Sequence, residues 1–246
     1  MSQRVAYVTG GMGGIGTAIC QQLAREGFRV VAGCGPNSSR KNRWLAEQKE
    51  LGFEFVASEG NVSEWESTKA AFDKVKAELG TVSVLVNNAG ITKDGVFRKM
   101  SVEDWMAVIA TNLNSLFFVT KQVVDGMLDQ GWGRIVNISS MNGQRGQFGQ
   151  TNYSTAKAGM HGFTMALAQE VASKGVTVNT VSPGYIGTEM VRAIREDVLE
   201  KIVSTIPVKR LGKPEEIASI VGWLATDAAG FTTGANFACN GGNYMT

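Results

Sequence analysis

The feature of this chain that most constrains its fold is an alternation of short apolar runs with segments of helical periodicity. Three apolar runs predict β-strands, at 5–8, 28–34 and 53–57. The segments that follow them predict helices, at 15–25, 40–51 and 64–79. Gly27, Gly52 and Gly80 lie just after these helices, where a left-handed backbone conformation is common and does not strain glycine. The repeat therefore indicates successive βα units.

The predicted strands are continuously apolar rather than alternating, which is typical of a parallel sheet covered on both faces. Further strands are predicted at 82–86, 133–139, 176–182 and 237–239. Further helices are predicted within 101–130 and at 153–173 and 214–225. About seven parallel strands predict a Rossmann-type doubly wound α/β fold, with 1–246 as a single nucleotide-binding domain. We expect segment 184–211 to be irregular and, with the Gly/Gln-rich stretch 142–151, to be the most mobile part.

Composition narrows the classes of function. One His and three Cys without C-x-x-C spacing predict no zinc site, and we expect no bound metal. The 24 Lys and Arg residues against 22 Asp and Glu, spread along the chain, give no electrostatic basis for nucleic-acid binding. No apolar run reaches the ~18 residues of a membrane span. The sparse, odd cysteine count and the absence of a signal-peptide pattern lead us to expect a cytoplasmic protein.

A glycine-rich segment, Thr9 to Gly16, follows the first predicted strand and opens the first predicted helix. Glycines at such a turn let the backbone approach a pyrophosphate, whose charge then faces the N–H groups of the helix N-terminus. The spacing T-G-x3-G-x-G is looser than G-x-G-x-x-G, and a tight turn can need glycine for packing alone. Because the segment occupies the first βα turn, we interpret it as a dinucleotide site. The predicted contacts are Gly10, Met12, Gly13, Gly14, Ile15 and Gly16.

The end of the second predicted strand indicates which dinucleotide is bound. An acidic residue that binds the ribose 2′-OH is expected there, but residues 32–41 contain no Asp or Glu. Without a carboxylate a 2′-phosphate meets no repulsion, and Arg40 and Lys41 can pair with it. The segment therefore favours NADP(H), with Gly35 and Arg40 as contacts. The alternative is that both cations are solvated residues at the start of a helix.

Tyr153 and Lys157 lie four residues apart, which places both on one face of a predicted helix. A nearby cation favours the phenolate, so we expect Lys157 to lower the pKa of Tyr153 from its ordinary value of about 10. Ser140 follows a predicted strand, and Asn112 interrupts a helical pattern as a mediocre helix former. Because the carboxyl ends of parallel strands share one edge, we expect these polar groups to meet there.

These motifs occur in the order and spacing of the short-chain dehydrogenase/reductase family, which the chain resembles over essentially its whole length. The motifs are the glycine-rich turn, N-N-A-G at 87–90, Asn112, Ser140-x12-Tyr153-x3-Lys157 and the pair Pro183-Gly184. The resemblance implies NAD(P)-dependent carbonyl and alcohol chemistry. It implies that Tyr153 donates the proton, Ser140 holds the carbonyl oxygen and Lys157 binds the nicotinamide ribose. Asn112 would anchor a water that links Lys157 to solvent.

The resemblance also implies further cofactor contacts at the ends of other strands. These are Gly60, Asn61, Val62, Asn88, Ala89, Gly90, Ile91, Thr92, Pro183, Gly184, Tyr185 and Ile186, together with Tyr153 and Lys157. Two departures from the family pattern concern the cofactor. Asn61 stands where an Asp commonly contacts adenine, and Met12-Gly13 stand where many NADP-dependent members carry a basic residue. The second departure leaves recognition of the 2′-phosphate to Arg40.

Within the family, the acetoacetyl-CoA reductases of bacterial polyhydroxybutyrate synthesis resemble this chain closely on three segments, 31–38, 142–153 and 182–185. This implies a homotetramer that reduces acetoacetyl-CoA to (R)-3-hydroxybutanoyl-CoA with NADPH. The implied substrate contacts are Asp94, Ser140, Gln147, Phe148, Gly149, Gln150, Gly184, Tyr185 and Arg195. Bulky Phe148 and Tyr185 favour a short acyl group. Arg195 can meet the CoA phosphates, with Lys99 and Arg192 as weaker candidates.

Several alternatives stay open from the sequence. A 3-oxoacyl-[acyl-carrier-protein] reductase performs the same reduction on a carrier-bound acyl group, and a sugar or steroid dehydrogenase shares the family motifs. A non-catalytic nucleotide binder is a third alternative, although such proteins typically lose the Tyr or the Lys. His161 lies four residues after Lys157, and we interpret it as a packed or interface residue. The apolar helices within 101–130 and 153–173 are candidates for a subunit interface.

Overall fold

The computed structural model describes residues 3–192 and 194–245. Within that part, seven parallel strands form one sheet in the order β3-β2-β1-β4-β5-β6-β7. The strands are β1 (Val5–Val8), β2 (Arg29–Cys34), β3 (Val56–Glu59), β4 (Val82–Asn87), β5 (Gly133–Ile138), β6 (Val176–Pro183) and β7 (Asn236–Cys239). The strand order changes direction between β1 and β4, the switch point of a doubly wound sheet. The predicted Rossmann-type α/β fold is therefore confirmed.

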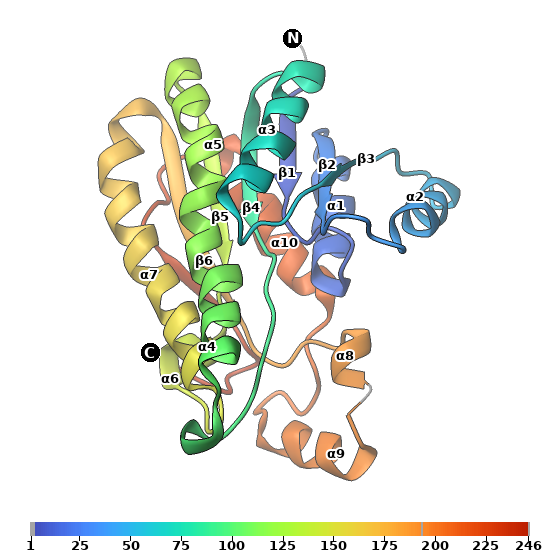
Figure 1. The fold of residues 1–246 in the computed structure, drawn as a ribbon, viewed down its shortest axis with the longest axis vertical. Helices are drawn as coiled ribbons and strands as arrows, with labels where there is room; N and C mark the ends of the chain where they lie inside the picture. The colour runs from blue at the N-terminus through green and yellow to red at the C-terminus, as the bar shows by residue number, and fades with distance from the viewer. Residues whose placement is uncertain (1–2, 193, 246) are drawn as a thin grey trace.

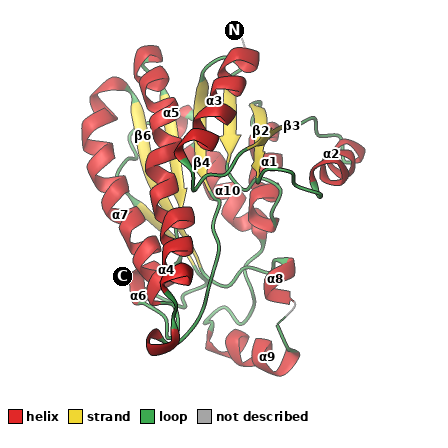
Figure 2. Cartoon of the chain, viewed as in Figure 1, coloured by secondary structure: helices red, strands yellow, loops and turns green. Residues whose placement is uncertain are grey.

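Figure 1 shows helices on both faces of the sheet, and Figure 2 shows the strands enclosed between them. The helices are α1 (Gly14–Arg25), α2 (Lys41–Glu50), α3 (Trp65–Leu79), α4 (Val102–Ile109), α5 (Ser115–Gln130), α6 (Met141–Arg145), α7 (Thr151–Val171), α8 (Glu189–Arg192), α9 (Glu196–Thr205) and α10 (Pro214–Leu224). Short 3-10 turns are Phe97–Lys99, Ala172–Lys174 and Asp227–Ala229, and a π-helical turn, Ala110–Asn114, joins α4 to α5.

Two apolar cores, one on each face, explain why the strands are apolar throughout. In β1, Ala6 and Val8 belong to the core beneath α1 and α10. Val5 and Tyr7 point to the other face and belong to the core beneath α3, α5 and α7. All four side chains are buried. Successive side chains of a strand point to opposite faces, so a strand covered on both faces needs an apolar residue at each position.

The three glycines that end helices adopt the backbone conformation expected of them. Gly27, Gly52 and Gly80 have φ of +88°, +85° and +86°. A Cβ added to any of them would meet no atom within 4 Å. Glycine is therefore favoured at these positions by the positive φ and not by lack of space.

The sequence-based elements are wrong in two places. Segment 184–211 is not irregular throughout, because α8 and α9 form in it. The mobility expected for 142–151, which begins within α6, stays a prediction. The third strand covers Val56–Glu59 rather than 53–57. Phe53 and Phe55 are apolar for another reason: they stack on each other, and Phe55 stacks on Trp44 of α2 at a centroid distance of 5.3 Å. These rings attach α2 to the sheet edge.

In the described ranges, no helix is both long and apolar enough to cross a membrane. Neither do the described residues gather three or more His, Cys, Asp or Glu side chains in a metal-binding arrangement.

Candidate active site

The carboxyl ends of the strands, at the lower end of the sheet in Figure 1, border a cleft of about 800 Å³. Most residues predicted from the sequence line this cleft: Gly10, Met12, Gly13, Gly14, Ile15, Gly16, Gly35, Arg40, Asn88, Ala89, Gly90, Ile91, Thr92, Ser140, Tyr153, Lys157, Pro183, Gly184, Tyr185 and Ile186. Its described lining does not include Gly60, Asn61, Val62, Asp94, Asn112, Gln147, Phe148, Gly149, Gln150 or Arg195. The turn after β1 and the catalytic candidates on β5 and α7 thus face one space.

The glycine-rich turn leads from β1 into α1 with almost no space for side chains. Gly10 has φ of +60°. A Cβ on Gly16 would overlap the carbonyl oxygen of Gly10. The N-cap Gly13 makes no side-chain cap and the first turn of α1 holds no acidic residue. Because helix N–H groups are unpaired in the first turn, this end of α1 is suited to an anion.

The turn after β4 is fixed against the glycine-rich turn by Thr9 and Asn88. Thr9 Oγ1 accepts hydrogen bonds from the backbone N–H groups of Asn88 and Ala89, at 2.9 and 3.0 Å. Asn88 Nδ2 donates to the carbonyl oxygens of Thr9 and Gly10, at 3.0 and 3.1 Å. The N-N-A-G motif therefore sets the width of the cleft at the switch point.

The end of β2 distinguishes the two cations predicted to meet a 2′-phosphate. Lys41 Nζ lies 3.0 Å from Glu59 Oε2, so its charge is already paired. Arg40 is exposed and lines the cleft. A carboxylate does line this side, that of Glu47 on α2, but it is paired with Arg43 at 2.7 Å. The free cation at this end of the cleft, among the described residues, is Arg40.

In the segment after β3, the side chain of Asn61 forms hydrogen bonds with residues close to it in the chain. Asn61 Oδ1 accepts from Ser63 N at 3.1 Å, and Asn61 Nδ2 donates to Glu64 Oε1 at 2.7 Å. These bonds close the turn before α3. Contacts of Gly60, Asn61 and Val62 with a cofactor stay a prediction.

Tyr153, near the start of α7, meets Ser140 from the end of β5. Burial raises the pKa of Tyr153 above its ordinary value; a hydrogen bond with Ser140 opposes this shift, and the charge of Asp94 adds to it. The sequence predicted the opposite direction, from the charge of Lys157. That charge is itself disfavoured, because burial lowers the pKa of Lys157 to about 7. One buried environment therefore favours the neutral form of both groups.

Lys157 and Asn112 come together around the turn after β4. Lys157 Nζ donates to the carbonyl oxygen of Ile138 at 2.7 Å and lies 5.6 Å from the Tyr153 ring centroid. Asn112 is fully buried in the π-helical turn. A Cβ on Gly90 would lie 3.2 Å from Asn112 Oδ1 and 3.6 Å from Lys157 Nζ. The absence of a side chain at Gly90 lets these two groups approach each other.

Two of the predicted substrate contacts are joined to each other. Gln150 Nε2 donates to Asp94 Oδ2 at 2.8 Å, and Gln150 Oε1 accepts from Asn142 Nδ2 at 2.9 Å. Gly95 N donates to Gly149 O at 2.8 Å. The loop after β4 and the loop before α7 are therefore connected beside Tyr153.

Three other predicted substrate contacts, Gln147, Phe148 and Arg195, are not part of the cleft lining. Phe148 is 85% exposed, so it is not a core residue. Gln147 Oε1 accepts from Arg145 Nη2 at 3.1 Å. Arg195 forms a bidentate pair with Asp197, at 2.6 and 2.8 Å, and its side chain is 79% exposed. The side chain of Arg192 lies outside the described residues, and Lys99 is exposed at the end of a 3-10 turn.

Several residues that are not among the predicted site residues also line the cleft, and two of them support the site. Thr188 packs on the glycine-rich turn, since a Cβ on Gly14 would lie 2.9 Å from its Cγ2. Ser139, next to Ser140, donates a hydrogen bond to α7. In the sequence, the adjacent serines Ser139 and Ser140 after a predicted strand were the signal for Ser139. No sequence signal indicated Thr188, because its segment was predicted to be irregular.

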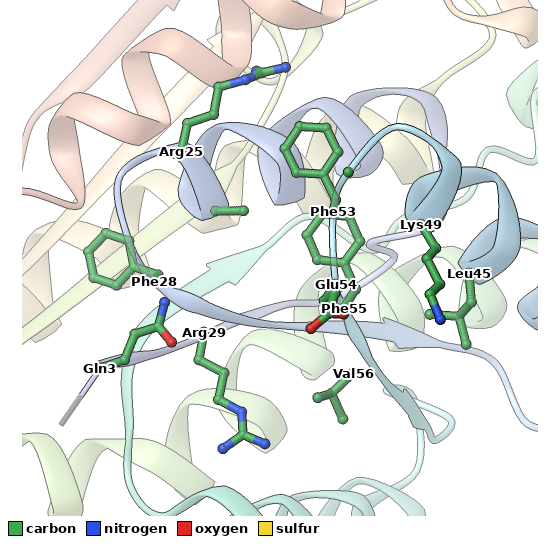
Figure 3. Close-up of a pocket in the computed structure, with 12 residues that line it drawn as sticks. Gln3, Arg25, Phe28, Arg29, Leu45, Lys49, Phe53, Glu54, Phe55 and Val56 are labelled. Carbon is green, nitrogen blue, oxygen red and sulfur yellow. The ribbon is translucent and has the colours of Figure 1, made fainter.

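A second hollow, of about 960 Å³, lies beside the amino end of β2. Figure 3 shows its cationic side chains, Arg25, Arg29 and Lys49, pointing in different directions. The Phe53 ring is stacked on Phe55 and also has the Arg25 guanidinium 5.1 Å from its centroid. This hollow therefore lacks the converging polar groups of a binding site.

The chain belongs to the short chain dehydrogenase family, whose model matches residues 4–199. It is thus a member of an oxidoreductase family whose Rossmann-type fold binds a nicotinamide dinucleotide. Acetoacetyl-CoA reductase of Cupriavidus necator is 76% identical over 245 residues, 100% of both chains. Nodulation protein G of Azospirillum brasilense is 58% identical over 100% of both chains. Acetoacetyl-CoA reductase of Allochromatium vinosum is 53% identical over 98% of this chain and 99% of the relative. The predicted resemblance to these reductases is confirmed.

Proposed function

We propose that this protein reduces acetoacetyl-CoA to (R)-3-hydroxybutanoyl-CoA with NADPH, as a step of polyhydroxybutyrate synthesis. The observation that carries the proposal is that one cleft holds both the glycine-rich turn and the side chains of Ser140, Tyr153 and Lys157. The substrate and the stereochemistry are proposed from the relatives named acetoacetyl-CoA reductase, at 76% and 53% identity.

In this proposal Tyr153 donates its phenolic proton to the carbonyl oxygen of the substrate. The bound cofactor supplies the hydride. Burial keeps the pKa of the phenol high, so Tyr153 holds its proton until the oxygen gains negative charge. Ser140, whose hydroxyl acts on the pKa of Tyr153, would donate to the same oxygen and keep it beside the phenol.

Lys157 and Asn112 would assist Tyr153 through the cofactor and a bound water. Lys157 would hold the nicotinamide ribose, and its buried Nζ is available for that from its position beside Gly90. Asn112 would anchor a water that connects Lys157 with solvent and so returns a proton to Tyr153. Asn112 accepts one hydrogen bond from Ile91 N and donates one to Ile91 O, which leaves one lone pair and one N–H of the side-chain amide for this water.

The residues of the cleft support NADPH as the cofactor. A Cβ at Gly11 or Gly16 of the glycine-rich turn would lie closer than 3.0 Å to neighbouring atoms, and the absence of these side chains lets the backbone approach a pyrophosphate. Arg40 is a free cation at the end of β2, whereas Lys41 and Glu47 are paired. We therefore propose that Arg40 pairs with the 2′-phosphate. The other cofactor contacts are those predicted from the sequence.

The substrate would lie between Tyr153, Tyr185 and the two connected loops. Gln150, which holds Asp94 by a hydrogen bond of 2.8 Å, lies three residues before Tyr153, so the connected loops lie near the reacting end. Asp197 takes the edge of the Arg195 guanidinium formed by Nε and Nη2, so a CoA phosphate would pair with the other edge, at Nη1.

Steady-state kinetics on two substrates test the proposal. We expect kcat/KM with NADPH to be higher for acetoacetyl-CoA than for acetoacetyl-carrier protein. A large preference for the carrier protein would instead assign a 3-oxoacyl-[acyl-carrier-protein] reductase. Negligible turnover of both would indicate a sugar or steroid dehydrogenase.

We also propose a homotetramer that acts in the cytoplasm. Val102, Met106 and Phe117 on α4 and α5 are exposed apolar side chains, and Met165 is another on α7. Exposed large apolar side chains such as these are typical of a subunit interface. The three described cysteines are free, as in a reducing compartment. Light scattering should give four times the chain mass; a monomeric mass would contradict the assembly.

A further inference from the structure

The end of β5 and the middle of α7 are fastened together at Lys157. Ile138, the last residue of β5, accepts the 2.7 Å hydrogen bond from Lys157 Nζ. Ser139, the next residue, donates from Oγ to the backbone carbonyl of Lys157 at 2.8 Å. Gly143 of α6 packs on the same point, since a Cβ there would lie 2.7 Å from the Lys157 carbonyl carbon. Ser140 stands between these contacts in the chain.

His161 extends this arrangement one helical turn further along α7. Its Nε2 lies 3.2 Å from Ser139 Oγ. A serine hydroxyl has one proton, and Ser139 gives it to the Lys157 carbonyl, which cannot donate. The Nε2 atom of His161 must therefore carry a proton and donate it to Ser139 Oγ. Burial lowers the pKa of His161 below its ordinary value, which favours the neutral ring that this arrangement requires.

We infer that Ser139 and His161 are positioning residues that hold Ser140 at a fixed distance from Tyr153 and Lys157. The His161 N–H occupies a lone pair of Ser139 Oγ and so directs the hydroxyl proton to the Lys157 carbonyl. Without that donor the hydroxyl can rotate, and the contact between β5 and α7 loosens. The inference rests on the proposed function, in which Ser140 and Tyr153 act on one oxygen. Misplacement of about 1 Å at such a site can cost about 100-fold in rate.

Variants of both residues test the pair. Ser139→Ala removes the hydroxyl, His161→Leu removes the donor at similar volume, and His161→Gln keeps an N–H donor. We expect Ser139→Ala and His161→Leu to lower kcat about tenfold, because the reacting groups are misplaced. The Kd for NADPH should change less than about twofold in both, because the glycine-rich turn is untouched. His161→Gln should recover most of the lost kcat.

Ser83→Ala is the matched control. Ser83 is 3% exposed, as is Ser139, and donates from a strand to Gln130 Oε1 at 3.2 Å, but it lies near the amino end of β4. Its loss should lower the Tm by an amount similar to that for Ser139→Ala while kcat stays at the wild-type value. If kcat falls in proportion to Tm in all variants, the pair only stabilises the fold and the inference is wrong.

A spectroscopic measurement tests the pair without turnover. His161 is the only histidine of the chain, so its ring gives a single set of ¹H–¹⁵N signals. We expect the neutral ring in wild-type protein to carry its proton on Nε2, and Ser139→Ala to reduce this preference. A proton on Nδ1 in the wild type would overturn the inference, as would wild-type kcat in His161→Leu. If the proposed function is wrong instead, the wild-type protein will not reduce acetoacetyl-CoA.

Discussion

Asn112 and Ile91 exchange two hydrogen bonds, from Ile91 N to Asn112 Oδ1 and from Asn112 Nδ2 to Ile91 O, each 2.8 Å long. A single side chain thereby pairs with the backbone of the loop after β4. The π-helical turn Ala110–Asn114 holds this side chain where α4 meets α5. Because Ile91 lines the cleft, the pair connects the helices of one face of the sheet to the candidate active site.

Replacing Asn112 should affect stability and activity together. Asn112→Ala leaves the N–H and C=O groups of Ile91 without partners, which should lower the free energy of unfolding by about 2 kcal/mol or more. We also expect kcat to fall at least about tenfold, since the loop beside Lys157 loses its support. Urea unfolding and steady-state kinetics measure the two effects. An unchanged free energy of unfolding would show that the pair does not form in solution.

Arg40 and Lys41 are adjacent cations with different expected effects on cofactor choice. Arg40→Ala should raise KM for NADPH roughly tenfold or more, the effect of one lost charge-assisted pair, with little change for NADH. Lys41→Ala is the matched control, because Lys41 is already paired with Glu59. It should raise KM for NADPH much less. Equal effects of Arg40→Ala on the two cofactors would contradict recognition of the 2′-phosphate.

Burial of Lys157 predicts a pH dependence of stability. Its pKa is about 7 in the folded protein and about 10.4 when unfolded, so the unfolded state binds the extra proton between these values. Burial of Lys157 therefore lowers the free energy of unfolding by its full amount below pH 7, and this destabilisation decreases as the pH rises towards 10.4. Lys157→Met should be stabilised relative to wild type most strongly near pH 6.

Urea unfolding of both proteins at pH 6, 8 and 9.5 measures this dependence. The difference in the free energy of unfolding between Lys157→Met and wild type should shrink with increasing pH. A difference that stays constant would mean that Lys157 keeps its charge in the folded state.

Much of the site could be predicted because it depends on spacing and on strand ends. Tyr153 and Lys157 face one cleft because four residues make about one turn of a helix. The glycine-rich turn lines that cleft because parallel strands place their carboxyl ends at one edge. These relations hold for any sequence with this alternation of strands and helices.

Side-chain partners could not be predicted in the same way. Arg195 is held by Asp197, two residues away, which takes one edge of the guanidinium. The pKa of Tyr153 is raised rather than lowered, because burial outweighs the cation that the spacing suggested. The hydrogen bond between Ser139 and Lys157 joins two elements at close range, and nothing in either segment alone indicates it.

The central claim is that Tyr153 supplies the proton to the substrate oxygen, and Tyr153→Phe tests it most directly. The variant keeps the ring and removes only the hydroxyl, so the Kd for NADPH, measured by fluorescence, should change less than about twofold. The kcat for acetoacetyl-CoA reduction should fall about 100-fold or more, the usual contribution of a general acid. Turnover near the wild-type rate in a variant that binds NADPH normally would contradict the account.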